Sequence, residues 1–127
     1  MPIASQWYSR SAVLYIYTDL ITAKQQHEAN LQFIGYLEAA SFPLHVIADW
    51  RNADNYPIDF EIVPDMLTML RHKNMGWIVV VGMNNVLSFW AEFFTKMAGL
   101  RYTACNSIED AAQFVAEHDN DQAASTR

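Results

Sequence analysis

The side chains best suited to chemistry stand where two predicted buried strands end. In a parallel sheet, ligand and regulatory sites collect outside the carboxyl ends of the strands. If these two strands are parallel neighbours, an acid, an indole, a guanidinium and three amides meet at one rim: Asp49, Trp50, Arg51, Asn52, Asn84 and Asn85. Such a rim can bind a small polar group or dock a partner protein. It can equally be two helix caps and a salt bridge between Asp49 and Arg51.

The sequence shows no recognisable catalytic arrangement. The candidate nucleophiles Ser41, Ser88, Ser107 and Cys105 have no G-x-S-x-G elbow around them. Neither a Walker loop nor a G-x-G-x-x-G motif occurs, and four glycines supply little for a phosphate cradle. A small enzyme that uses Asp49 with Arg51 is therefore the weakest of three functional hypotheses. We expect a protein with no catalytic residues and no cofactor.

The four histidines and the single cysteine do not form a metal-binding pattern. No two of these histidines stand three or four residues apart, the spacing that places two zinc ligands on one helix face. We expect His27 to be a half-buried packing residue and His45 to be a core residue with one satisfied ring nitrogen. Cys105, at a predicted strand end, is expected to be a small buried apolar residue rather than a reactive thiol.

The strands and helices that must position the rim follow from the apolar pattern. The apolar runs over residues 43–50 and 76–81 lack the polar alternation of a half-exposed strand. This pattern is typical of strands buried on both faces of a sheet. Five strands are predicted, over residues 3–8, 12–21, 43–50, 76–81 and 101–105. Four helices are predicted, over residues 22–40, 60–73, 85–98 and from 107 onward. The order predicts an α/β fold with a mixed sheet of about five strands, an N-terminal antiparallel hairpin, parallel later strands and about four helices.

Local signals mark the ends of two of these helices. Thr22 and Gln25 have the spacing of a capping box, and the apolar stripe of that helix is expected at Leu31, Ile34 and Leu37. Pro64 fits the next helix only in its first turn or at a kink.

Residues 1–118 are predicted to form a single domain, and residues 119–127 a disordered polar tail.

The helix predicted over residues 85–98 carries an apolar face wider than one sheet contact requires. A helix that lies on a sheet needs a stripe of roughly 100°, and this one covers roughly 160°. Part of this face is therefore expected to meet a second surface, either a dimer partner or only more core. The candidate interface residues are Phe89, Trp90, Phe93, Phe94 and Met97.

Charge and cysteine content limit the partners and the compartment. The formal net charge of -6 gives a surface that repels phosphate backbones and anionic lipid, so we expect neither nucleic-acid binding nor membrane adsorption. One cysteine excludes an internal disulfide and a multi-cysteine metal site. No apolar run reaches the roughly 20 residues of a membrane span. A cytoplasmic protein, with a homodimer or a protein partner, is the expectation.

Four segments together resemble the STAS fold of anti-sigma-factor antagonists, and more closely its SpoIIAA-like branch: Val13 to Thr22, His45 to Arg51, Gly76 to Asn85 and Ser107 to Val115. The resemblance is one of element order and covers nearly the whole chain. It implies a serine, phosphorylated to break a partner complex, at the start of the helix after the central strand. The corresponding residues 49–63 contain no Ser, Thr or Cys, and Tyr56 is the only hydroxyl there.

Two functions follow as hypotheses from the resemblance and the composition. The first is a non-catalytic STAS-like regulatory or protein-interaction module that lacks the usual phosphorylatable serine. The second is a carrier or sensor of a small apolar, lipid-like ligand, because SpoIIAA-like domains resemble lipid-transfer folds. The methionine and aromatic content suits an adaptable pocket.

Overall fold

The computed structural model describes residues 3–54, 63–82 and 101–125, which form one five-stranded sheet and three helices. The strands lie in the order β1-β2-β3-β4-β5: Ile3–Ser9, Ala12–Asp19, Leu44–Ala53, Met75–Val81 and Tyr102–Cys105. β1 pairs antiparallel with β2, and every later pair is parallel. The predicted mixed sheet with an N-terminal hairpin is therefore confirmed.

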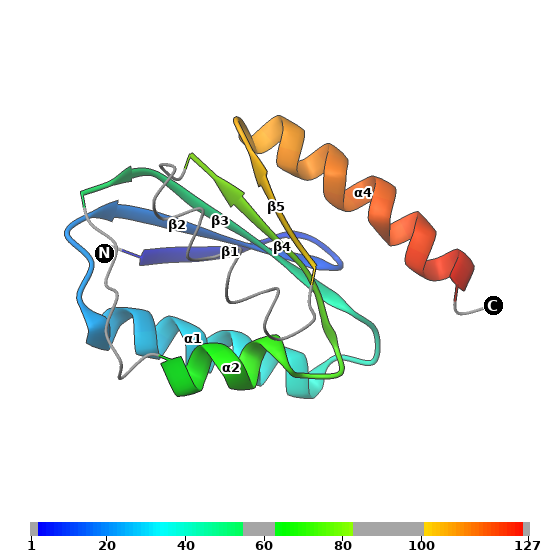
Figure 1. Ribbon diagram of the computed structural model, residues 1–127, viewed down its shortest axis with the longest axis horizontal. Helices are drawn as coiled ribbons and strands as arrows, with labels where there is room; N and C mark the ends of the chain where they lie inside the picture. The colour runs from blue at the N-terminus through cyan, green and yellow to red at the C-terminus, as the bar shows by residue number, and fades with distance from the viewer. Residues whose placement is uncertain (1–2, 55–62, 83–100, 126–127) are drawn as a thin grey trace.

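Helices cover both faces of the sheet. α1 (Ala23–Ala39) and α2 (Val63–Leu70) lie side by side on one face, and α4 (Ile108–Ser125) lies on the other (Figure 1). Each face buries its own apolar cluster, one that contains Phe33 and Trp50 and one that contains Ile47 and Val115. These are three of about four expected helices. The fourth, over residues 85–98, lies outside the described residues.

Strand β3 is the centre of the sheet and is buried from Leu44 to Trp50. It packs closely against β4, because a Cβ atom at Gly76 would stand 2.6 Å from Nδ1 of His45. The backbone N–H of Trp77 donates to that same Nδ1 at 2.9 Å. The prediction that His45 is a core residue with a satisfied ring nitrogen is confirmed, since none of it is exposed.

The start of α1 matches its prediction, and its buried face matches in part. The capping box is present: Thr22 Oγ1 accepts from the Gln25 N–H, and the Gln25 side chain accepts from the Thr22 N–H. Of the predicted apolar stripe, Leu37 is buried and Ile34 is partly buried against the core, but Leu31 is half exposed. The helix buries four residues spaced as one face: Gln26, Asn30, Phe33 and Leu37. The prediction was wrong at Leu31 because two of the buried positions are amides, which bond to each other, Gln26 Nε2 to Asn30 Oδ1 at 2.8 Å.

The other two helices have different ends from those predicted. α2 begins at Val63, so Pro64 lies in its first turn as expected, but it ends at Leu70 rather than near Lys73. A turn follows, in which the Met75 N–H donates to the His72 carbonyl at 3.0 Å. α4 begins after Ser107, whose hydroxyl accepts from the Asp110 N–H, and it continues past His118 to Ser125. The alanines near its end favour a helix. The domain boundary at 118 stays a prediction.

A contact between α1 and α2 adds to what was predicted for His27. His27 was expected to be a half-buried packing residue, and its side chain is 48% exposed, so the expected half burial is confirmed. The sequence did not indicate its partner, the Asp65 carboxylate of α2, because that residue is 38 positions away. The contact between the His27 Nδ1 and Asp65 joins the two helices that cover this face.

Two glycines should respond in opposite directions to alanine. Gly35 lies within α1, and nothing beyond the helix's own backbone stands within 4 Å of the point that a Cβ atom would occupy. Gly35→Ala should therefore stabilise the fold by about 0.5–1 kcal/mol, because it restricts the unfolded chain. Gly76→Ala should destabilise it by about 1–3 kcal/mol, because the new methyl collides with His45 and the Leu44 carbonyl. Urea unfolding of both variants measures the two effects. Equal changes in the unfolding free energy of the two variants would contradict the close packing at Gly76 and the open space at Gly35.

Candidate functional site

The carboxyl ends of the parallel strands meet at one edge of the sheet, as the sequence predicted. Asp49 on β3 is in register with Ile16 on β2 and with Val81 on β4, and Val81 is in register with Cys105 on β5. Strand alternation then divides the predicted rim between two faces. Trp50 packs into the cluster under α1 and α2, whereas Asp49 and Arg51 point toward the face that α4 covers.

Asp49 and Arg51 form a two-pronged ion pair at this end of the sheet. Nε of Arg51 donates to Oδ1 of Asp49 at 2.9 Å, and its Nη2 donates to Oδ2 at 3.0 Å. The Arg51 N–H adds a third hydrogen bond to Oδ1, at 3.1 Å. Gly82 lies against this pair with a φ of +76°, and a Cβ there would stand 2.3 Å from Cγ of Arg51. The salt-bridge interpretation of these two residues is confirmed.

The pair settles the protonation of Asp49. Burial favours the neutral acid, but the hydrogen bonds and the charge of Arg51 outweigh it and hold the Asp49 pKa below its ordinary value. Only 4% of Asp49 is exposed, while the Arg51 side chain remains 45% exposed. A carboxylate whose two oxygens already accept three hydrogen bonds is poorly suited to serve as a base or nucleophile. Its role here is structural.

On the opposite face, Trp50 stacks on Tyr17, a residue that sequence analysis missed. Their ring centroids are 3.7 Å apart and the rings are inclined by only 7°. Both side chains are buried, together with Ile21 from the loop that leads to α1. The signal was available, because Tyr17 lies within a predicted strand, two residues after Tyr15, and so shares a face with it. The two stacked rings belong to the apolar cluster and lie at its end beneath the rim.

The exposed part of the rim comes from the ends of β2 and β3 and from the residues that follow them. Asp19, the last residue of β2, adopts a left-handed backbone with φ of 58°, and its carbonyl accepts from the Asp54 N–H at 2.8 Å. This bond ties the two strand ends together. Leu20, which follows Asp19, is 64% exposed, and Asn52, a predicted rim residue, is also exposed here. A single exposed leucine is common on a protein surface, so the position of these residues at the carboxyl end of the sheet is what makes them candidates for a docking surface.

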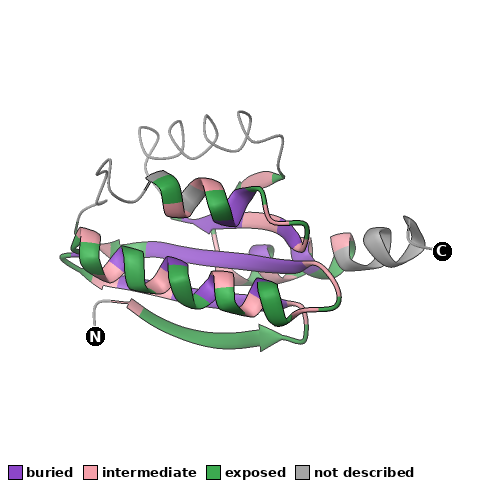
Figure 2. Cartoon of the chain, turned by 90° about the horizontal axis from the view of Figure 1, so that it is seen from below, coloured by how far each residue is buried: buried purple, intermediate pink, exposed green. Residues whose placement is uncertain are grey.

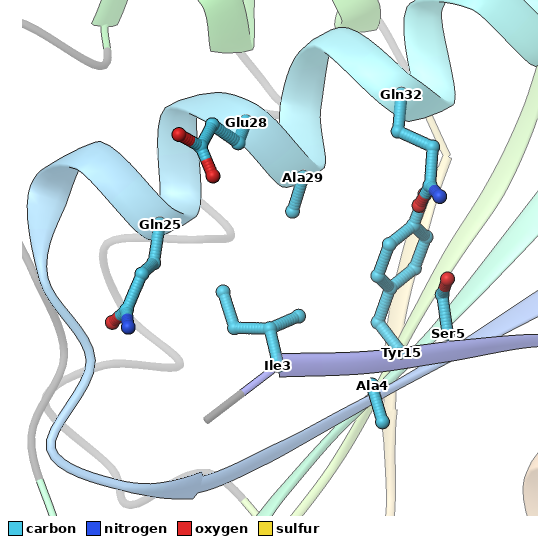
Figure 3. A pocket seen from close by; sticks show the side chains of 8 residues that line it. All are labelled: Ile3, Ala4, Ser5, Tyr15, Gln25, Glu28, Ala29 and Gln32. Carbon is cyan, nitrogen blue, oxygen red and sulfur yellow. The ribbon is translucent and has the colours of Figure 1, made fainter. Parts of the chain in front are cut away.

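A separate groove lies between α1 and strand β1, and nothing in the sequence pattern had indicated it. It has a volume of about 530 Å³ and is open along one side (Figure 3). Ile3 and Ser5 point from β1 toward the helix, and the Tyr15 hydroxyl at its inner wall donates to Oε1 of Gln32 at 2.9 Å. Burial raises the pKa of Tyr15, so this phenol stays protonated and acts as a donor. Its remaining lining residues are Ala4, Gln25, Glu28 and Ala29.

Several predicted residues lie outside the part of the chain that the structure describes. They are Asn84, Asn85, Phe89, Trp90, Phe93, Phe94 and Met97.

Cys105 is half-buried rather than buried. Its burial, and to a smaller extent the nearby charge of Asp110, raises the pKa of its thiol. Within the described ranges, no group of three or more histidine, cysteine or acidic side chains is arranged to hold a metal ion. No helix described there has the length and apolar content to cross a membrane.

Comparison with known proteins gives a fold and no sequence family. No family model matches the chain, and no curated protein matches it. Among solved structures, it is similar to an uncharacterised DUF3478-family protein with a SpoIIAA-like fold from Shewanella loihica PV-4. The TM-score is 0.63 at 12% identity, over 88% of this chain and 90% of that one. It is also similar to the Bacillus cell fate determinant SpoIIAA in its phosphorylated form. The TM-score there is 0.62 at 8% identity, over 89% and 98% of the two chains. The fold is therefore SpoIIAA-like.

The Asp49–Arg51 pair should leave a pH signature in stability. An acid whose folded pKa lies below its unfolded value, about 3.9, contributes stability above that unfolded value and loses it as the pH falls through the folded pKa. We expect Asp49→Asn to flatten the fall in unfolding free energy below about pH 4. Urea unfolding from pH 7 to pH 3 measures this.

The double variant supplies the control for this ion pair. Arg51→Gln leaves the buried carboxylate without its main donors, so it should destabilise the protein at pH 7. Asp49→Asn with Arg51→Gln should lose less stability than the sum of the two single changes. Two results would show that the pair does not couple these residues. One is a loss of unfolding free energy in the double variant equal to the sum of the single losses. The other is a pH dependence of stability in Asp49→Asn equal to that of the wild type.

Proposed function

We propose that this chain is a non-catalytic, SpoIIAA-like regulatory module that acts by binding a protein partner. The single observation that carries the proposal is the SpoIIAA-like fold of the sheet. Binding sites of open α/β sheets collect at the carboxyl end of the strands, where Leu20 is exposed. Asp19, Asn52 and Asp54 are exposed at the same end, and their acceptors suit a partner surface that carries basic and apolar groups.

Regulation through a phosphorylated serine is not part of this proposal. The segment 49–63, where the resemblance to STAS antagonists implies that serine, has none, and it has no threonine either. The first turn of α2 already contains a carboxylate, Asp65, which pairs with His27 of α1. A negative charge at a helix N-terminus is favoured by the helix dipole, and here it is built into the chain. We therefore infer partner binding that does not depend on phosphorylation at this segment.

A catalytic role has less support than a binding role. The acid with the best position for chemistry, Asp49, is buried and fully engaged by Arg51. The neighbouring aromatic rings of Tyr17 and Trp50 are stacked within the core rather than exposed at the rim. A cytoplasmic, homodimeric protein remains part of the proposal.

The alternative function, a carrier of a small apolar ligand, has one observation in its favour. The groove between β1 and α1 falls within the range of roughly 300–1,000 Å³ that small-molecule sites occupy. Most of its lining surface is apolar, and Ser5, Gln25, Glu28, Gln32 and the Tyr15 hydroxyl add polar groups, so a small apolar ligand that carries a polar group suits it. Native mass spectrometry of freshly purified protein decides this alternative, because a carrier would show an adduct of constant mass.

Leu20→Asp should abolish partner binding without unfolding the chain. We expect the loss of binding and the retained fold because the Leu20 side chain is exposed, so it contributes surface to the rim and little to the core. The matched control is Leu31→Asp, which makes the same change at a half-exposed leucine on α1. We would crosslink wild-type protein and both variants in cells of the source organism and quantify the covalent complexes by mass spectrometry.

The proposal expects specific complexes with wild-type protein and with Leu31→Asp, and at least a tenfold loss with Leu20→Asp, which corresponds to about 1.4 kcal/mol of binding free energy. Circular dichroism and thermal unfolding of both variants establish that they are folded. Equal crosslinking of Leu20→Asp and wild type would move the partner surface away from the rim. An absence of any specific complex would remove the function itself.

A further inference from the structure

Strand β1 forms one edge of the described sheet and carries neither of two common protections of an edge strand. Natural edge strands are commonly blocked by charged side chains or proline. The residues from Ile3 to Ser9 include neither. They are exposed along almost the whole strand, which begins beside the N-terminal label (Figure 2), and they include Trp7 at 49% and Tyr8 at 43% exposure. An uncharged strand is also the surface on which two copies of a chain with a net charge of -6 approach each other with least repulsion.

The regular part of β1 is short and has a defined centre. Its pairing with β2 is continuous from Ile3 to Trp7, and a bulge then interrupts the register before Ser9. The midpoint of this regular segment is Ser5. Ile3, Ser5 and Trp7 share the face turned toward α1, because they are in register with the inward-facing residues of β2.

From this geometry we propose that two copies of the chain pair through β1, antiparallel and centred on Ser5, to form a sheet that continues across a two-fold axis. Pairing of this kind satisfies the outward backbone groups of both edge strands. A two-fold contact is self-complementary, so the same residues serve on both sides. The inference assigns a surface to the homodimer of the proposed function, and it stands apart from the partner surface at the carboxyl end of the sheet.

The groove beside β1 gives this pairing its side-chain contact. In a register centred on Ser5, the Trp7 of the second copy stands opposite Ile3, at the mouth of the groove between β1 and α1. Ile3 and Ala29 offer apolar surface there, and Glu28 offers an acceptor for the indole N–H, which is a donor only. Each copy therefore covers the other's groove with a tryptophan. In its own subunit, Trp7 contacts only the Tyr36 ring among the described aromatic rings, at a centroid distance of 5.1 Å.

Disulfide trapping tests both the pairing and its register. In a Cys105→Ala background, Ser5→Cys places two thiols directly opposite each other, at the roughly 4.5–5.5 Å Cα separation of antiparallel partners, within the disulfide range. Ala4→Cys is the matched control. In the proposed register its two copies are offset by two residues, so their Cα atoms lie roughly 8 Å apart, too far to bridge. Mild oxidation followed by non-reducing electrophoresis measures the crosslinked dimer that each of the two cysteine variants forms.

A second measurement does not depend on cysteine. Five paired residues make a small interface, and such contacts are weak, so light scattering is performed at hundreds of micromolar protein. We expect the wild-type mass to rise above 14.6 kDa with concentration, and Ser5→Lys to stay at 14.6 kDa, because two like charges face each other at the axis. Thermal unfolding establishes that Ser5→Lys is folded.

The proposal expects a crosslinked dimer with Ser5→Cys, at least tenfold less with Ala4→Cys, and a monomer with Ser5→Lys. Equal crosslinking of the two cysteine variants would overturn the register and with it the tryptophan contact. A dimer that persists in Ser5→Lys, without crosslinking of Ser5→Cys, would assign self-association to another surface. A wild-type monomer at the highest concentration, with no crosslink, would remove the pairing while leaving the docking rim untouched.

Discussion

The burial of β3 on both faces is the constraint on which the rest of this structure depends. Seven consecutive residues, from Leu44 to Trp50, lose contact with water, and both faces of the strand must be covered for that to occur. α1 and α2 supply one cover and α4 the other. The same burial obliges His45 and Asp49, the two titratable residues of this buried segment, to find partners inside the protein. His45 finds the N–H of Trp77, and Asp49 finds Arg51.

Local chemistry determined how much of the fold the sequence could predict. The capping box at Thr22 and the two buried strands depend on neighbouring residues and were predicted correctly, and Pro64 takes the first of its two predicted positions, the first turn. The face of α1 was predicted only in part, because periodicity alone ranks Leu31 as buried and an amide as exposed. Nor could the sequence pair His27 with Asp65, since that contact forms only when α1 and α2 pack together.

The candidate site shows where a single rule about strands would have improved the prediction. Residues two apart on a strand share a face, so Asp49 and Arg51 can meet while Trp50, between them, must point the other way. Applied to the predicted strands, this rule separates the ion pair from the aromatic stack. It does not find the Asp19 turn or the groove beside β1. Those depend on how loops and α1 lie against the sheet, which is tertiary packing.

The buried amide pair of α1 has a consequence for how firmly that helix is held. Gln26 and Asn30 bond to each other, yet Oε1 of Gln26 and Nδ2 of Asn30 have no hydrogen-bond partner among the described residues. Each buried group left in this state costs about 1–3 kcal/mol, since it gives up water and receives nothing in return. The first half of α1 thus depends on its capping box and on the contact of His27 with Asp65, whereas Phe33 and Leu37 anchor the second half in the apolar core. We expect local opening of this helix to begin in its first turns, at the end where the sheet meets its surroundings.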